Sequence, residues 1–150
     1  RGDGMRKLVA AACAAIVIAS AGFAMAASDL GKQREADMKA IGGALKAASS
    51  FATGKEAYDA AAAKAAMETI AAKATEFPTL FPEGSEKADG AASPKIWENK
   101  ADFEAHAAKL ATDAKAAATA ADSGAEAFKT AFGTVAANCK SCHQLYRLSD

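Results

Sequence analysis

The sequence predicts an all-α fold, an antiparallel up-down four-helix bundle, and three observations lead to it. Hydrophobic residues make up 51% of the 150 residues, and much of that share is alanine, the residue that most favours helices. β-branched and aromatic residues, which favour strands, are sparse. Apolar residues recur at steps of three and four in four stretches, which is the period of a helix with one buried face.

The first predicted helix covers residues 29–52 and the second covers residues 56–76. Gly54 ends the first, and Pro78 and Pro82 end the second because proline cannot continue a helix. The inward-facing positions of the first helix are Leu30, Arg34, Met38, Ile41, Leu45 and Ala48. Those of the second are Ala60, Ala63, Met67, Ile70, Ala74 and Phe77. The short link between the two helices favours an antiparallel pair.

Two adjacent glycines, Gly42 and Gly43, stand inside the first predicted helix. Glycine destabilises a helix interior relative to alanine, by about 1 kcal/mol, so a pair there calls for a reason. The pair therefore predicts the close approach of a neighbouring helix or of a bound group.

A connection rich in glycine, proline and serine follows, at residues 78–98. It is longer than most links between helices, so we expect it to pack over other parts of the chain. The aromatic side chains Phe77, Phe81 and Trp97 lie in or beside it and are expected to pack there.

The third predicted helix covers residues 99–121, with Asn99 and Asp102 as a capping pair, and a short link joins it to the fourth. The fourth begins at Ser123, with Glu126 completing a capping box, and ends near Arg147. The inward positions of the third are Phe103, Ala107, Leu110, Ala114, Ala117 and Ala121. Those of the fourth are Phe128, Phe132, Val135, Cys139, Cys142 and Tyr146.

Residues 1–26 are interpreted as a short extension followed by a secretion signal. Arg6 and Lys7 form its positive start, residues 8–23 its apolar run, and Ala24-Met25-Ala26 its small-x-small cleavage site. The apolar run is shorter than the ~18 to 20 residues that a membrane-spanning helix needs, so we expect no stable membrane insertion. Cleavage near Ala26 would leave residues 27–150 as a single exported domain.

The charge pattern limits the function classes. The formal net charge is +0 and neither a run of like charges nor a basic stripe occurs, which gives no reason to expect nucleic-acid binding. No constellation of acid, base and nucleophile is visible either. The chain is therefore expected to be a binding or carrier protein and not an enzyme.

The chemistry is concentrated in "NCKSCHQLYR", which places Cys139, Cys142 and His143 within five positions. On a helix, residues three and four apart share one face, so the three side chains point the same way. Cys-x-x-Cys-His attaches haem covalently: both thiols form thioethers with the vinyl groups, and the histidine binds the iron. Haem is the favoured interpretation of this motif.

Two interpretations without haem remain open. Zinc could be held by the motif together with His106, although adjacent residues on one helix do not easily converge on a tetrahedral metal. A redox dithiol is the other, although such motifs usually open a helix that follows a strand, where the thiol pKa is lowered. An export signal favours haem, because bacterial c-type haem is attached after export.

Beyond its haem motif, the mature chain resembles the class II c-type cytochromes, cytochrome c′ and cytochrome c-556. Segments along essentially its whole length carry the likeness: "QREADMKAIGGALKA" resembles the first helix of the family, and "FPTLFPEGS" and "SPKIWENKADF" resemble its central loop and the start of its third helix. The combination with a C-terminal "NCKSCHQLYR" is more specific than the haem motif alone.

The resemblance implies a role for each residue that matches the motifs. Cys139 and Cys142 would be the thioether sites, and His143 the proximal iron ligand. Arg147 matches a basic residue near the proximal histidine, and Arg34 matches an arginine near the haem propionates.

Met38 matches the distal position, on the open side of the iron. That position usually holds a bulky apolar residue in cytochromes c′ and a methionine that binds iron in cytochromes c-556. The first implies a periplasmic c′-like protein that transfers single electrons and binds NO or CO. This c′-like protein is the favoured interpretation, and the alternative, implied by the second, is a low-spin electron carrier with Met38 as tentative sixth ligand. The family resemblance also implies redox partner proteins and permits a homodimer through the first two helices.

Overall fold

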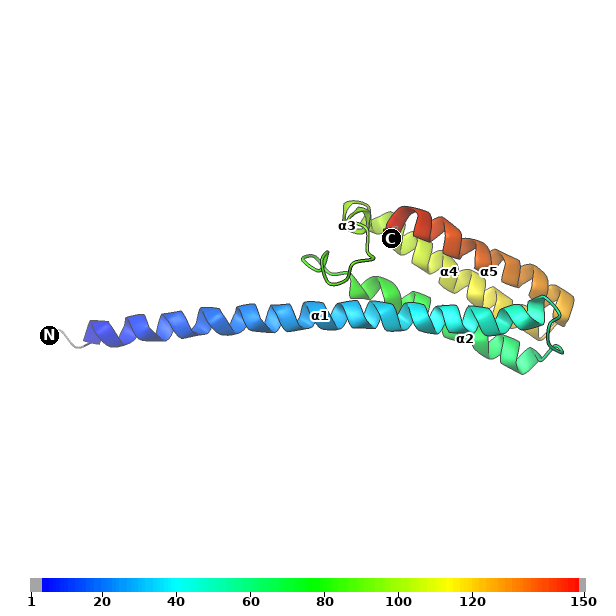
Figure 1. Ribbon diagram of the computed structural model, residues 1–150, viewed down its shortest axis with the longest axis horizontal. Coiled ribbons are helices and arrows are strands. Elements are labelled where there is room, and N and C mark those ends of the chain that lie inside the picture. Colours follow the sequence, from blue (N-terminus) through cyan, green and yellow to red (C-terminus); the bar gives the residue numbers. More distant parts are fainter. Residues whose placement is uncertain (1–3, 149–150) are drawn as a thin grey trace.

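The computed structural model describes the backbone of residues 4–148 and the side chains of residues 27–148. Four long helices dominate it: α1 (Gly4–Ala52), α2 (Ala60–Glu76), α4 (Lys100–Ala121) and α5 (Ala125–Tyr146). Figure 1 shows α1 running past the end of a bundle formed by its second half and the other three. The side chains of residues 1–26, on which the predicted signal and cleavage site fall, lie outside the described ones.

The four long helices form an antiparallel up-down bundle, which confirms the predicted fold class (Figure 1). Neighbours around the bundle are α1 with α2, α2 with α4, α4 with α5, and α5 with α1. The α2–α4 pair has the most extensive contact and the α1–α5 pair the least. Among the described residues, no helix is both long enough and apolar enough to cross a bilayer.

The interior has two parts. The first, here called the alanine core, lies along the middle of the bundle and contains Ala48, Ala63, Ala114, Ala117 and Ala121, all at 0% exposure, with Ile41, Met67, Ile70, Phe128 and Val135. The second, the aromatic cluster, consists of Leu80, Phe81, Ile96, Phe103 and Tyr146. Small side chains let helices approach closely, whereas bulky rings need more space between the elements that they join.

The connection after α2 contains two short helical pieces, η1 (Phe77–Leu80) and α3 (Lys95–Glu98). Between them, residues 81–94, here called the strap, cross one end of the bundle. The strap packs as predicted: Phe81 is 3% exposed and belongs to the aromatic cluster. The strap also joins the end of α5, where the backbone N–H of Ser93 donates to the Tyr146 carbonyl at 3.0 Å.

The start of α2 was predicted four residues too early. The helix begins at Ala60, because the Asp59 side chain accepts a hydrogen bond from the backbone N–H of Ala62 at 2.9 Å. An aspartate in this position satisfies a donor that the first turn leaves free and so fixes the helix start.

Both predicted capping arrangements of the later helices are wrong. Asn99 makes no side-chain cap bond at the start of α4, and Asp102 accepts a hydrogen bond from the Tyr146 hydroxyl instead. At the start of α5, the N-cap is Gly124, with φ of 105° and no side-chain cap bond, in place of Ser123. That positive φ favours glycine and moves Ser123 out of the capping position.

The predicted close helix approach at Gly42 and Gly43 is also wrong. A Cβ atom built on either glycine would meet nothing within 4 Å. The close approach occurs instead at Gly31, where a Cβ would lie 2.2 Å from the carbonyl oxygen of Ala88 in the strap. Whether a bound group approaches Gly42 and Gly43 stays a prediction.

Candidate functional site

The last turns of α5 bring Cys139, Cys142 and His143 onto one side of the helix. The helix stays continuous through Tyr146, so the spacings of three and four residues align the side chains as predicted. Both cysteines are half-buried free thiols, and Cys142 packs against the aromatic cluster. The imidazole of His143, one position on, lies at a more exposed place.

The electrostatics of the motif do not suit a redox dithiol. Burial raises the pKa of the Cys142 thiol to about 11, and the charges of Cys139 and Asp102 add to the effect. Burial also raises the pKa of Cys139. A reactive dithiol needs a lowered pKa, because the thiolate is the nucleophile. Burial, and then the positive charge of Arg147, lowers the pKa of His143, which favours the neutral imidazole that binds metals.

The zinc interpretation also lacks its site. Within residues 27–148, no group of three or more His, Cys, Asp or Glu side chains could hold a metal ion. The contacts of His106 are with other groups, since its Nε2 lies 3.5 Å from the Asp102 carboxylate and its ring lies 5.8 Å from that of Tyr146.

Aromatic side chains form the wall beside the cysteines. The ring centroids of Phe81 and Phe103 are 4.9 Å apart and those of Phe103 and Tyr146 are 5.4 Å apart, both edge-on. Phe77 and Trp97 extend the wall from either side of the strap. A flat apolar macrocycle joined to Cys142 would lie against such a surface, so the residues present fit a covalently attached haem.

Arg34, predicted near the propionates, is turned toward the connection. The residue is 3% exposed, and its guanidinium donates to the carbonyl oxygens of Leu80 and Ser85, the Ser85 hydroxyl and the Asp89 carboxylate. It also lies 4.0 Å from the centroid of the Phe81 ring. The propionate contact stays a prediction, while the contacts with the strap and η1 are observed.

The other predicted site residues lie as follows. Met38 is half-buried on α1, one turn after Arg34, and packs against the alanine core. Arg147 is exposed just beyond α5, where its backbone N–H donates to the His143 carbonyl at 3.1 Å and its strand-like backbone pairs with Ala92.

Sequence analysis missed a buried carboxylate between Arg34 and Met38. Asp37 is 4% exposed and its Oδ1 accepts from Lys73 of α2 at 2.9 Å, whereas its Oδ2 has no hydrogen-bond partner among the described residues. The available signal was position: Asp37 lies three residues after Arg34 and therefore on the same helix face. Asp89, the ion-pair partner of Arg34, is 55 residues away and carries no such signal.

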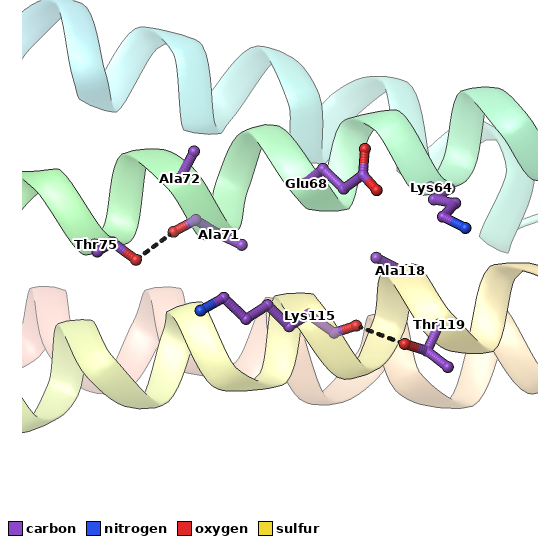
Figure 2. Close-up of a pocket in the computed structure, with 8 residues that line it drawn as sticks. All are labelled: Lys64, Glu68, Ala71, Ala72, Thr75, Lys115, Ala118 and Thr119. Carbon is purple, nitrogen blue, oxygen red and sulfur yellow. Dashed lines mark hydrogen bonds between the residues drawn. The ribbon is translucent and has the colours of Figure 1, made fainter.

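An open groove of about 480 Å³ on the outside of the bundle is separate from this site. It lies between α2 and α4, and Figure 2 shows Glu68 on α2 and Lys115 on α4, with Ala71 and Ala118 between the two helices. Hydrogen bonds from Thr75 to the Ala71 carbonyl and from Thr119 to the Lys115 carbonyl belong to the helices themselves. The groove contains no residue of the cysteine motif.

Known proteins resemble this chain along most of its length. The family described as Cytochrome C' matches residues 29–147. The chain belongs to the cytochrome c′ family. A relative named cytochrome c-556 from Agrobacterium fabrum is 47% identical over 128 residues, which cover 85% of this chain and 86% of the relative.

Solved structures of cytochrome c′ share the fold. The protein from Rhodopseudomonas palustris matches with a TM-score of 0.76 and 37% identity, over 81% of this chain and 98% of that one. The nitric oxide complex of a mutant of cytochrome c′ from Alcaligenes xylosoxidans matches with a TM-score of 0.76 and 28% identity, over 83% of this chain and 97% of that one. The cofactor of the family is one covalently attached haem c, and the Cys139–Cys142 pair provides the attachment chemistry here.

Proposed function

We propose that this protein is a periplasmic one-electron carrier with one haem c. The observation that carries the proposal is the placement of Cys139, Cys142 and His143 on one side of α5, beside the aromatic cluster. The haem, when bound, supplies an iron that cycles between its ferric and ferrous states. The family comprises haem electron carriers and gas binders, which supports the proposal.

The residues of the chain divide the work of holding the cofactor. Cys139 and Cys142 would each form a thioether, so that the group cannot dissociate. His143 would bind the iron through a neutral imidazole nitrogen, the form that its lowered pKa favours. The aromatic cluster excludes water from one side, and burial and solvent exclusion are among the means by which a protein sets the potential of its haem.

We propose further that Met38 supplies the sixth ligand. Its thioether is a good iron ligand, and methionine–histidine ligation raises the potential and suits electron transfer. Met38 lies one turn after the buried Arg34 on the same face of α1, and α1 is a neighbour of α5 in the bundle. The resemblance to cytochrome c-556, with the 47% identical relative of that name, supports this assignment.

A second candidate function is the binding of diatomic gases at an open sixth position. The specific observation in its favour is the fold match to a cytochrome c′ in complex with nitric oxide. The packing of Met38 against the alanine core also supports it, because a sulfur held there would leave the iron open. NO or CO would then bind on the side of Met38.

Optical spectroscopy of the purified holoprotein, with Met38→Ala and Met67→Ala variants, tests these proposals. We expect a mass increase of one haem and a low-spin ferric spectrum with a methionine–iron charge-transfer band that Met38→Ala abolishes. Met67, at 0% exposure in the alanine core, serves as the control, and its replacement should leave the band in place. A polypeptide without haem would overturn the carrier proposal. A high-spin ferric spectrum of the wild type would overturn ligation by Met38 and would support gas binding instead.

Export and association are further parts of the proposal. We expect cleavage near Ala26 to yield a periplasmic domain of residues 27–150, which N-terminal sequencing of the secreted protein tests. Redox partner proteins would dock at the end of the bundle that carries the haem motif. A homodimer through α1 and α2 is expected from the resemblance to the family, and light scattering on the holoprotein measures it.

A further inference from the structure

The strap is fastened to α1 by a buried arginine. The Arg34 guanidinium donates to Leu80 at 2.9 and 3.0 Å, to the Ser85 hydroxyl at 2.7 Å and to the Asp89 carboxylate at 2.8 Å. Bonds from a charged donor are stronger than neutral ones, and a planar guanidinium fixes several acceptors at once. One side chain of α1 therefore holds the strap and the end of η1 together.

A second, independent contact joins the strap to α1 one turn earlier. The carbonyl oxygen of Ala88 lies against the backbone of α1 at Gly31, so close that a Cβ there would be only 2.2 Å away. No side chain fits at that position without moving the strap. Gly31 and Arg34, three residues apart on one helix face, are here called the clasp.

The other end of the strap is tied to α5 through backbone atoms. Ser93 donates to the Tyr146 carbonyl at 3.0 Å, and Leu148 donates to the Ala91 carbonyl at 2.8 Å. Tyr146, which accepts the first of these bonds, lies three residues after His143. Arg34 and Gly31 of the clasp lie about one and two turns before Met38. The strap thus connects the two helices that carry the proposed iron ligands, and its attachment points are close to both ligands in sequence.

The bundle itself gives this pair of helices little other support. Contact between α1 and α5 is the weakest among the neighbouring long helices. We propose that Gly31 and Arg34 are positioning residues that, by fastening the strap to α1, hold Met38 where its sulfur reaches the iron bound by His143. The inference rests on the proposed ligation by Met38 and assigns the control of that ligation to the clasp.

The expected behaviour differs from that of a propionate ligand. An arginine that only bound propionates would be independent of Gly31, since a methyl group at that position changes no charge. A clasp instead predicts that Gly31→Ala and Arg34→Gln have the same effect on the spectrum. It also predicts that Arg34→Lys fails to restore the wild-type spectrum, because an ammonium cannot copy the planar set of bonds.

The test uses the holoprotein with Gly31→Ala and Arg34→Gln, each with a matched control. Gly133→Ala adds the same methyl group to a helix, α5, at an exposed place with no atom within 4 Å, and Lys32→Gln removes an exposed charge from α1. We expect both clasp variants, and neither control, to raise the high-spin ferric fraction by about threefold or more. Trypsin cleavage at the exposed Lys87 reports separately on release of the strap.

Each outcome bears on the proposal. Faster cleavage at Lys87 with an unchanged spectrum in both variants would overturn it, because the clasp would then hold the strap and nothing more. If the wild type is itself high-spin, the proposal that Met38 binds the iron is wrong. The role of the clasp is then tested by the rate of CO association, which should change about threefold or more in both variants. An unchanged rate would overturn it, and Asp89→Asn, a milder change, replaces any variant that does not fold.

Discussion

The two parts of the interior are stabilised in different ways. In the alanine core, helices α2 and α4 pack closely through residues such as Ala63, Ala114 and Ala117, each at 0% exposure, and few polar side chains take part. The aromatic cluster instead consists of large rings packed beneath the strap, and the buried guanidinium of Arg34 lies against Phe81.

The alanine core stabilises the bundle, whereas the end with the aromatic cluster is the part that can hold a cofactor. Close packing of small residues holds helices by many weak contacts and offers no space for a cofactor. An end held by a strap and specific polar bonds can enclose a large flat group, but it depends on a few side chains. The predictions below test that division.

The largest expected effects come from matched phenylalanines in the two parts. Phe128 of the alanine core and Phe103 of the aromatic cluster are 0% and 2% exposed, so replacement of either by alanine should cost about 3–5 kcal/mol of unfolding free energy. Only Phe103→Ala should also alter the visible spectrum of the holoprotein. Urea unfolding and absorption spectra measure both, and an equal spectral change in Phe128→Ala would remove the distinction.

A middle-sized effect is expected where Asp89 meets the clasp. Burial alone would raise the pKa of Asp89, but hydrogen bonds from Arg34 and from the backbone of Ala91 and Ala92 outweigh it and lower the pKa below 3.8. A lowered folded-state pKa gives stability that is present above the unfolded-state value and is lost as the pH falls through the folded-state value. Asp89→Asn should therefore destabilise the protein by about 1–3 kcal/mol at neutral pH.

That difference between Asp89→Asn and the wild type should begin to shrink below pH 3.8 and should disappear as the pH falls through the lower folded-state pKa, where the carboxyl of the folded wild type also becomes neutral. Urea unfolding in a series of buffers from neutral to acidic measures it. Glu83→Gln, at an exposed strap position, is the control and should leave the unfolding free energy almost unchanged. A difference that stays constant into the acidic range would contradict a role for the Asp89 charge.

The smallest effect is expected at Asp37. One carboxylate oxygen has no partner among the described residues, and an unmade buried hydrogen bond costs about 1–3 kcal/mol. This cost offsets the ion pair with Lys73, whose side chain is 34% exposed and also binds Glu76. Asp37→Leu should therefore lie within about 1 kcal/mol of the wild type, on the more stable side, by urea unfolding. A loss of more than about 2 kcal/mol would show that the carboxylate stabilises this end of the bundle.

The sequence predicts the helices and their C-terminal ends well, but it places the start of α2 and the N-terminal caps of α4 and α5 wrongly. Periodicity places Ile41, Met67 and Phe128 inside because burial follows a repeat of three to four residues, which is readable along the chain. A helix start depends on which single residue forms its N-cap, and Asp59 and Gly124 form the N-caps of α2 and α5 in place of the predicted positions.

The residues of the candidate site also differ in how well the sequence predicts them. Cys139, Cys142 and His143 lie close together in sequence, so a helix alone brings them together as predicted. The partners of Arg34 lie 46 to 55 residues away, in a connection without periodic structure, and nothing local identifies them. Asp37 and Gly31 were overlooked for the same reason, since their contacts are with α2 and the strap.

The tie between the strap and α5 has a consequence for how this chain can vary. The bonds of Ser93 and Leu148 with Tyr146 and Ala91 use only main-chain N–H and carbonyl groups. The bonds themselves require no particular side chain, and among the genetically encoded residues only proline lacks the N–H at residue 93 or 148. The C-terminal attachment can therefore persist through extensive sequence drift, while the attachment at α1 depends on the identity of one glycine and one arginine.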